Sequence, residues 1–233
     1  MPVKLNHYWT VIHGRRNDYE KFIIKKFIPT VNKLGLHTVA GWCVLVGAYS
    51  EIFFECVSND LDQLEKALQH PKYKEIKAQL LNYVKNYKTK VLVKTGKIDS
   101  YSTDIHSGTV KFAQMWDLIS DKKKEYGQYV INEFYPLLEE LGISIASEWE
   151  VLIGDGPNII CEGRAKDIGN LISNLQSKKF RHAKKMLKEY IENYESRILI
   201  FHVHKKKGYK SESYELIPEC CLLYTSDAAD DDT

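Results

Sequence analysis

The sequence predicts an α+β protein built from two tandem copies of one βαββαβ unit. Three observations predict this fold class: an internal repeat, a change of apolar periodicity within each copy, and turn-forming glycines at matching positions. Trp116 follows Trp9 by 107 residues, and with this shift the two halves align without a gap as far as Leu92 and Leu199. Self-similarity at a fixed spacing is the signature of a duplicated structural unit.

Identical residues recur along the whole aligned span. They include Tyr19/Tyr126, Phe27/Phe134, Pro29/Pro136, Leu34-Gly35/Leu141-Gly142, Trp42/Trp149, Glu55/Glu162 and Asn86-Tyr87/Asn193-Tyr194. Two tryptophans in register make a chance match untenable. The repeat therefore predicts a first unit over residues 1–97, a linker over 98–108, a second unit over 109–206 and a C-terminal extension over 207–220.

The first strand and the first helix of each copy are visible in the spacing of apolar residues. Residues 8–13 are rich in β-branched and aromatic side chains, as strands are. Tyr19, Ile23 and Phe27 then recur at every fourth position, which indicates one buried face of a helix. We expect this helix to end at the repeated Leu-Gly pair, because glycine readily adopts the left-handed conformation of a helix C-terminus.

A hairpin follows the first helix. Residues 38–46 and 51–57 have the composition of β-strands, and the glycine-containing residues 47–50 lie between them. In the second copy the corresponding turn is 154–157, with the run Gly-Asp-Gly-Pro. These glycine-rich turns predict reverse turns within a hairpin rather than a phosphate-binding loop, which would precede a helix.

The second helical region is predicted to break in two and to lead into a fourth strand. Asn59-Asp60 is a plausible helix cap, and His70-Pro71 marks a restart, because proline suits the first turn of a helix. Tyr73, Ile76 and Leu80 form the buried stripe of the second piece. Residues 87–94 and 194–203 close the two copies as strands, which completes the order βαββαβ twice.

This order is that of a ferredoxin-like unit, in which two helices cover one face of the sheet and leave the other face bare. A bare apolar face of that size needs a cover, and the second copy is the obvious one. In this respect residues 6–204 resemble the dimeric α/β-barrel superfamily. The segment His70-Pro71-Lys72-Tyr73-Lys74, its amphipathic helix and the Tyr-rich strand after it resemble NIPSNAP-like and antibiotic-biosynthesis-monooxygenase-like members. The resemblance implies a pseudo-dimeric α/β barrel that binds a small molecule.

Polar residues on the predicted strands are the candidates for a ligand site. The predicted set is Glu55, Lys90, Asp117, Glu148, Glu150, Glu162, Arg164 and Arg197. The Glu55/Glu162 pair is the one strand carboxylate retained in both copies. Each of its members could act as an acid or base in an apolar barrel, or could simply accept a hydrogen bond from a neighbouring Tyr or Trp.

Two interpretations of this polar set remain open. In the first, strand four of one copy lies beside strand two of the other, and Lys88 and Lys90 form ion pairs with Glu148 and Glu150. In the second, the acidic residues, Arg164 and Arg197 form a polar pocket. A real cavity lined by Asp117, Glu148, Glu162 and Arg164 would favour small-molecule binding, whereas mutual salt bridges and packed aromatic rings there would favour a non-catalytic structural or interaction module.

Metals and cofactors are weakly indicated. His202 and His204 stand at i, i+2 on one strand and could offer two ligands, but a third and a fourth are not evident, so no metal site is predicted. One axial histidine suffices for haem, so a haem-binding or monooxygenase-like enzyme is a further alternative. The cofactor and the catalytic residues are not identified by the sequence.

The charge balance and the lengths of the apolar runs limit the classes of partner that the protein is expected to bind. Thirty-three Lys+Arg residues against 31 Asp+Glu residues give a net charge of +2, which predicts no strong attraction to nucleic acid. The basic runs 122–124 and 205–207 are expected to be solvated. The five cysteines show no metal spacing, and no apolar run is long enough to cross a bilayer. We therefore expect a cytoplasmic protein without nucleic-acid or membrane partners, and homo-oligomerisation is compatible with this pattern.

The last residues differ from the rest. Residues 221–233 lack helical or strand periodicity and end in an acidic, small-residue tract. This tract resembles the translated sequencing-adapter read-through found in open reading frames assembled from environmental DNA. We therefore expect a non-native tail, and the alternative is a disordered acidic one.

Overall fold

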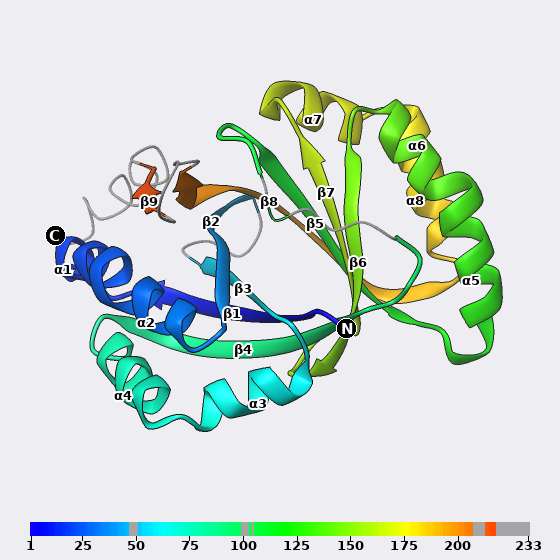
Figure 1. Ribbon diagram of the computed structural model, residues 1–233. Helices are drawn as coiled ribbons and strands as arrows, with labels where there is room; N and C mark the ends of the chain where they lie inside the picture. Colours follow the sequence, from blue (N-terminus) through cyan, green and yellow to red (C-terminus); the bar gives the residue numbers. More distant parts are fainter. Residues whose placement is uncertain (47–50, 99–102, 104, 207–212, 218–233) are drawn as a thin grey trace, which may run out of the picture. The chain divides into compact units, whose positions relative to one another are not determined.

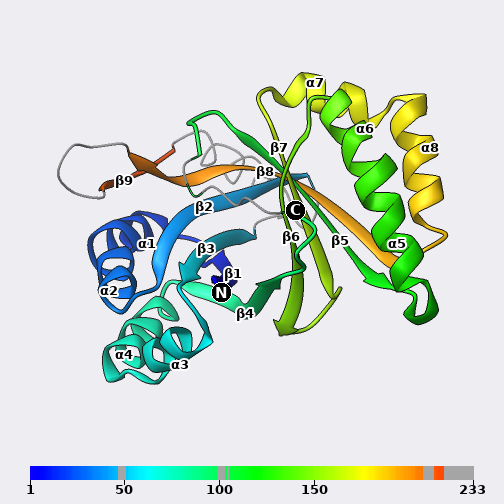
Figure 2. The same ribbon diagram turned by 45° about the vertical axis from the view of Figure 1, so that its right-hand side comes forward.

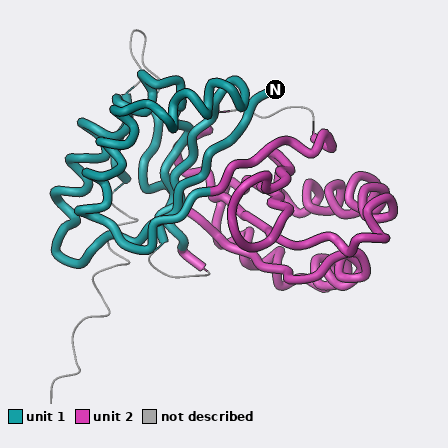
Figure 3. Tube along the Cα trace, turned by 90° about the horizontal axis from the view of Figure 1, so that it is seen from below, with its two compact units in different colours: residues 1–44, 48–89, 200–233 teal, residues 45–47, 90–199 magenta. Residues whose placement is uncertain are grey.

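The computed structural model describes residues 1–46, 51–98, 103, 105–206 and 213–217. The turn expected at residues 47–50, part of the expected linker, much of the C-terminal extension and the expected non-native tail lie outside the described residues. The chain divides into two compact units (Figure 3). Unit 1 comprises Met1–Val44, Ala48–Thr89 and Ile200–Thr233, and unit 2 comprises Leu45–Gly47 and Lys90–Leu199.

Unit 1 contains the elements of the first repeat, apart from the ends of β2 and β4. They are β1 (Val3–Val11), α1 (Arg16–Phe22), a π-helical turn (Ile23–Phe27), α2 (Ile28–Lys33), β2 (His37–Val46), β3 (Ile52–Ser58), α3 (Leu61–Gln69), α4 (Pro71–Leu80) and β4 (Val84–Lys94). The strands follow the order β2-β3-β1-β4, and β1 and β2 both pair antiparallel with β3. Helices α1–α4 lie on one side of these strands (Figures 1 and 2).

Unit 2 repeats this arrangement. Its elements are β5 (Val110–Leu118), a 3-10 turn (Ser120–Lys122), α5 (Lys123–Tyr129), a π-helical turn (Val130–Phe134), α6 (Tyr135–Glu140), β6 (Ser144–Ile153), β7 (Ile159–Ala165), α7 (Ile168–Leu175), α8 (Lys178–Leu187) and β8 (Ile191–Lys206). The strand order is β6-β7-β5-β8, with every pair antiparallel. The predicted order βαββαβ is confirmed in both copies.

The last strand of each repeat crosses from one compact unit into the other. Val91–Lys94, at the end of β4, pairs antiparallel with β6 inside unit 2. The end of β8, from Ile200 onward, belongs to unit 1, where β2 and β8 pair and a short strand β9 (Ser213–Leu216) is added to β8. The expectation that strand four of one copy lies beside strand two of the other is thus confirmed.

A π-helical turn interrupts the first helix of each repeat at the same place. Pro29 and Pro136 follow these turns as the second residues of α2 and α6. Proline has no backbone N–H and its ring clashes with the carbonyl four residues earlier, so a wider turn before it relieves both problems. The wider turn also explains the spacing of four between the buried residues Tyr19, Ile23 and Phe27. In a regular α-helix, with 3.6 residues per turn, residues at this spacing would gradually rotate away from the sheet.

Helix ends follow the predicted signals. Gly35 and Gly142 end the first helical region of each repeat with φ values of 84° and 71°, as the Leu-Gly pairs predict. The carboxylates of Asp60 and Asp167 accept hydrogen bonds from the backbone N–H groups of Gln63 (2.7 Å) and Asn170 (2.6 Å). Such caps satisfy backbone donors that have no partner within the helix.

Replacing Asp60 or Asp167 with alanine should each lower the free energy of unfolding by about 1 kcal/mol, because one N-terminal backbone donor of α3 or α7 loses its partner. Urea denaturation followed by circular dichroism measures this change. Asp62→Ala is the matched control, since Asp62 lies in the first turn of α3 without being its cap. An equal loss in Asp62→Ala would show that charge near the helix end, rather than the cap bond, carries the effect.

Aromatic residues fill the core of both units in the same pattern. The Trp9 indole N–H donates to the Tyr19 hydroxyl (2.9 Å), and the Trp116 indole N–H donates to the Tyr126 hydroxyl (3.2 Å). Each tryptophan also stacks on a tyrosine of the last strand, Tyr87 or Tyr194, with ring centroids 6.3 and 6.1 Å apart. Both tryptophans are fully buried, so the conspicuous Trp repeats are core positions.

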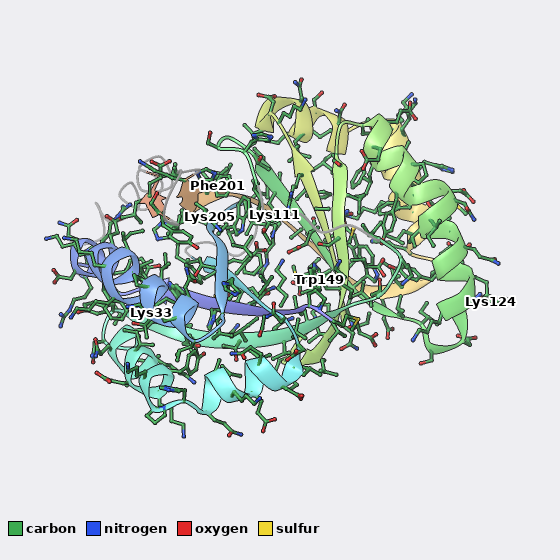
Figure 4. All side chains as sticks on the ribbon, in the orientation of Figure 1. Lys33, Lys111, Lys124, Trp149, Phe201 and Lys205 are labelled. Carbon is green, nitrogen blue, oxygen red and sulfur yellow. The ribbon has the colours of Figure 1, made fainter. Side chains whose placement is uncertain are left out.

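The lysine run, the lengths of the helices and the cysteines can be compared with what the composition predicts. Lys122, Lys123 and Lys124 are exposed, and Figure 4 labels Lys124 at the edge of unit 2, as expected for solvated charge. Within the described residues, no helix combines the length and the apolar character needed to cross a bilayer. Cys56 and Cys161 are buried free thiols, whereas Cys43 takes part in a disulfide, which is rare in cytoplasmic proteins and was not expected from the sequence.

Candidate functional site

Each unit buries one Lys–Glu ion pair at equivalent positions. Lys4 and Glu55 lie 2.8 Å apart in unit 1 with both side chains fully buried, and Lys111 and Glu162 lie 2.8 Å apart in unit 2 with side chains at most 2% exposed. Lys111 follows Lys4 by the same 107 residues that separate the two glutamates. Neither lysine belongs to the predicted site, because the predicted repeat begins at Trp9 and Trp116, although the repeat continues upstream of both.

The pair in unit 2 is embedded in a larger hydrogen-bond network. The Ser147 hydroxyl (2.8 Å) and the Trp149 indole N–H (3.0 Å) both donate to Oε2 of Glu162, while Lys111 donates to Oε1. Trp149 on β6 and Lys111 on β5 are labelled in Figure 4. Glu162 therefore accepts a hydrogen bond from a neighbouring tryptophan, as its structural interpretation predicts. In the first repeat Ala40 stands in place of Ser147 and cannot supply the hydroxyl.

Arg164 connects this buried pair to a pocket at the surface of unit 2. It lies two residues after Glu162 on β7, so the two side chains share a face of the sheet, and its cross-strand partner is Lys111. Arg164 also lines a cavity of about 600 Å³ between the ends of α6 and β7 and the start of α7. Ile105, Leu141 and Leu171 supply apolar side chains to the cavity lining, and Lys166 supplies a second cationic group beside Arg164.

A second polar cluster in unit 2 is centred on Glu148, whose side chain is fully buried. The hydroxyls of Tyr126 (2.7 Å) and Tyr135 both donate to Oε2 of Glu148, and Lys97 Nζ lies 2.6 Å from Oε1. Burial, followed by the nearby Glu148 charge, raises the pKa of Tyr126 well above its usual value. Burial also raises the pKa of Tyr135. Both phenols therefore stay protonated donors near neutral pH.

Unit 1 has histidines in the equivalent region. His7 Nδ1 lies 2.9 Å from the Tyr87 hydroxyl, where unit 2 has Gln114 accepting from Tyr194. His202 stacks on Tyr19 with ring centroids 5.7 Å apart. Burial lowers the pKa of His7 and of His202 to about 3, with Lys77 and Arg16 contributing to the respective shifts. Both imidazoles are consequently neutral over the physiological range.

The predicted site residues are not all brought together. Glu162, Arg164 and Arg197 share one face of the unit 2 sheet, because Ala113 is the cross-strand partner of both Glu162 and Arg197. Glu148 points to the opposite face, where the α5 and α6 tyrosines contact it. Its ion pair is formed by Lys97 rather than by the expected Lys88 or Lys90, since the β4–β6 register sets Val93 opposite Glu150.

The remaining candidates have local roles. Glu150 is exposed on β6. Asp117 accepts hydrogen bonds from the Asn158 backbone N–H (2.8 Å) and from the Asn193 amide (3.0 Å), which joins β5 to the starts of β7 and β8. Arg197 lies 3.9 Å from Glu195. Lys90 lies close to the Gly154–Pro157 turn, with its Nζ 3.4 Å from where a Cβ of Gly156 would stand.

Metal ligands are not gathered in the described parts of the two units. No group of three His, Cys, Asp or Glu side chains with metal-binding geometry occurs among the described residues. His204 Nδ1 lies 3.7 Å from Glu215, and His202 is stacked on Tyr19. The haem alternative stays a prediction that these contacts do not test.

Comparison with known proteins gives matches to solved structures alone: no protein-family model and no curated protein matches the chain. A "putative monooxygenase" from Fusobacterium nucleatum is 14% identical with a TM-score of 0.61, over 93% of this chain and 98% of that one. A "putative monooxygenase" from Lactobacillus acidophilus is 10% identical with a TM-score of 0.56, over 85% and 93%. A NIPSNAP family protein from Agrobacterium tumefaciens is 12% identical with a TM-score of 0.35, over 41% and 95%.

Matches at such low identity show the fold and nothing finer. The two long matches are both described as monooxygenases, one of the two kinds of protein that the sequence resembles. The two long matches confirm the predicted α+β class with tandem ferredoxin-like units.

Proposed function

We propose that unit 2 binds a small organic anion in the cavity beside Arg164. The observation that carries this proposal is a cavity of about 600 Å³ that a guanidinium lines, on the same strand as the buried Glu162. Small-molecule sites in proteins have volumes of roughly 300–1,000 Å³. Arg164 is therefore the one member of the predicted polar set that we assign to ligand binding.

The charges around the cavity favour an anionic ligand. Two carboxylates also line it, but Asp167 already caps α7 and Glu140 forms an ion pair with Lys179. Arg164 and Lys166 supply the cationic part of the lining, and an arginine can hold a carboxylate through two parallel hydrogen bonds. Because apolar side chains also line the cavity, the fitting ligand is a monocarboxylate with a short hydrocarbon or aromatic body.

A non-catalytic structural or interaction module is the second candidate function. Two observations favour it: Glu55, Glu148 and Glu162 are buried and paired with lysines, and Asp117, Glu148 and Glu162 do not line the Arg164 cavity. Mutual ion pairs at these positions are what the sequence leads us to expect of such a module. Buried ion pairs of this kind specify how strands dock more than they add stability. The two candidates differ in one outcome, namely whether the Arg164 cavity takes up a ligand.

Ligand-observed NMR with a panel of aliphatic and aromatic monocarboxylates tests the proposal. Arg164→Gln should weaken the binding of each carboxylate at least tenfold, equivalent to about 1.4 kcal/mol, because the paired hydrogen bonds are lost. Arg197→Gln is the matched control, since Arg197 lies on the same sheet face outside the lining of the cavity. The primary amides of the same acids should bind weakly to every variant.

Two results would count against the proposal. If no member of the panel binds the unaltered protein, the module becomes the favoured function. If Arg164→Gln and Arg197→Gln weaken binding equally, the carboxylates are held by general positive charge rather than by this cavity.

A further inference from the structure

Glu148 is an addition of the second repeat rather than a requirement of the fold. Its counterpart in the first repeat is Gly41, where an added Cβ would lie 3.1 Å from Val203 Cβ and 3.2 Å from Phe54 Cδ2. The first repeat therefore fills this region by close packing. The second repeat instead buries a carboxylate, which is costly unless a specific partner compensates its charge.

The surroundings of Glu148 have the chemistry that recognises an ammonium group. Lys97 Nζ is 2.6 Å from the carboxylate and 5.1 Å from the centroid of the Tyr126 ring, so carboxylate and aromatic face hold the same cation. The hydroxyls of Tyr126 and Tyr135 donate to the other carboxylate oxygen and fix its orientation. The result is a preformed acceptor for one –NH₃⁺ group.

The cation that fills this acceptor comes from a segment outside the regular elements. β4 ends at Lys94, and Lys97 follows it in a bend. The Lys97 side chain is 18% exposed, whereas that of Glu148 is fully buried. The ammonium therefore stands between the carboxylate and solvent, on a flexible side chain carried by a connecting segment, and such segments open locally at low free-energy cost.

We propose that Glu148, Tyr126 and Tyr135 form a binding site for the ammonium group of a small primary alkylamine, which Lys97 occupies in the free protein. A ligand amine takes over the contacts when Lys97 withdraws. Because Lys97 is part of the same chain, it competes with a free amine for this site at an effective concentration of roughly millimolar. It therefore weakens the apparent affinity of the site for a free amine without abolishing binding. This site uses other residues than the Arg164 cavity and does not depend on it.

The test uses n-butylamine, which is protonated at pH 7.5, with n-butanol as the neutral probe of similar size. Binding is measured by ligand-observed NMR titration and by the shift in melting temperature. Lys97→Ala should bind n-butylammonium at least tenfold more tightly than the unaltered protein, which should bind it weakly but saturably. The double variant Lys97→Ala/Glu148→Gln should lose this gain, and n-butanol should bind none of the three with comparable affinity.

Each other outcome overturns the proposal. Equal binding of n-butanol would mean that the variant merely contains an apolar hole. Absence of saturable binding to the unaltered protein at 100 times the Kd of Lys97→Ala would mean that Lys97 is a fixed structural partner. If Lys97→Ala does not fold, Lys97→Gln takes its place, and failure of n-butylamine to promote refolding more than n-butanol would be equally decisive against the site.

Discussion

Replacing Lys111 with methionine should lower the free energy of unfolding by about 3–5 kcal/mol, since the buried Glu162 carboxylate would lose the lysine that lies 2.8 Å from it. Ser147 and Trp149 would still donate to the carboxylate, but they carry no compensating charge. A proton can neutralise the stranded carboxylate, so the loss should be smaller at pH 5 than at pH 8. Urea denaturation at the two pH values, followed by far-ultraviolet circular dichroism, measures both effects.

A double-mutant cycle separates the ion pair from simple packing. Lys111→Met/Glu162→Gln should recover much of the loss, because replacing both charges removes the uncompensated one. Lys4→Met is the matched variant in unit 1 and should cost at least as much, since Ala40 cannot donate the hydroxyl that Ser147 supplies. If the double variant is as unstable as Lys111→Met alone, the lysine matters for its hydrocarbon chain rather than for its charge.

Element order was predictable because it depends on local signals that occur twice. The Leu-Gly helix ends, the His70-Pro71 restart and the buried stripes all act over a few residues, and each is checked by its counterpart 107 positions away. Strand ends were predicted less well. β1 begins at Val3 rather than at residue 8, and β8 continues to Lys206, since pairing partners rather than local composition set where a strand stops.

The candidate site was less predictable because it depends on register between strands. Grouping Glu148 with Glu162 assumed that both point to one face, but pairing of Ser147 with Glu162 places Ser147 and Trp149 on that face and turns Glu148 to the helices. A shift of one residue exchanges the two faces of a strand, and no single-strand pattern fixes it. The β-bulge between Ile145 and Ser147 makes such a shift harder still to foresee.

Comparing the two repeats position by position separates residues that support the fold from residues that differ. Positions that support the shared fold are identical, such as the Lys–Glu pairs and the Trp–Tyr pairs. Positions that differ, such as Gly41 and Glu148, are equivalent in the two repeats but hold different chemistry. The two binding sites that we propose, the Arg164 cavity and the Glu148 cluster, therefore both lie in unit 2.

Substituting alanine for Gly163 should destabilise unit 2 by about 1–3 kcal/mol, which is the usual cost of overpacking a core. A Cβ on Gly163 would stand only 2.5 Å from Cγ2 of Ile143, and Ile143 is fully buried, so it has little room to move. Urea denaturation of the variant measures the loss. The first repeat has Cys56 and Leu36 at these two positions and accommodates a side chain there.

The steric origin of this loss can be isolated with Ile143→Ala. That substitution alone should cost about 2–5 kcal/mol, because it removes buried apolar atoms and leaves a cavity. Adding Gly163→Ala to it should then cost little or restore some stability, since the new methyl group occupies part of the space that the isoleucine vacated. An equal cost of Gly163→Ala in both backgrounds would instead show that the loss does not come from the contact with Ile143.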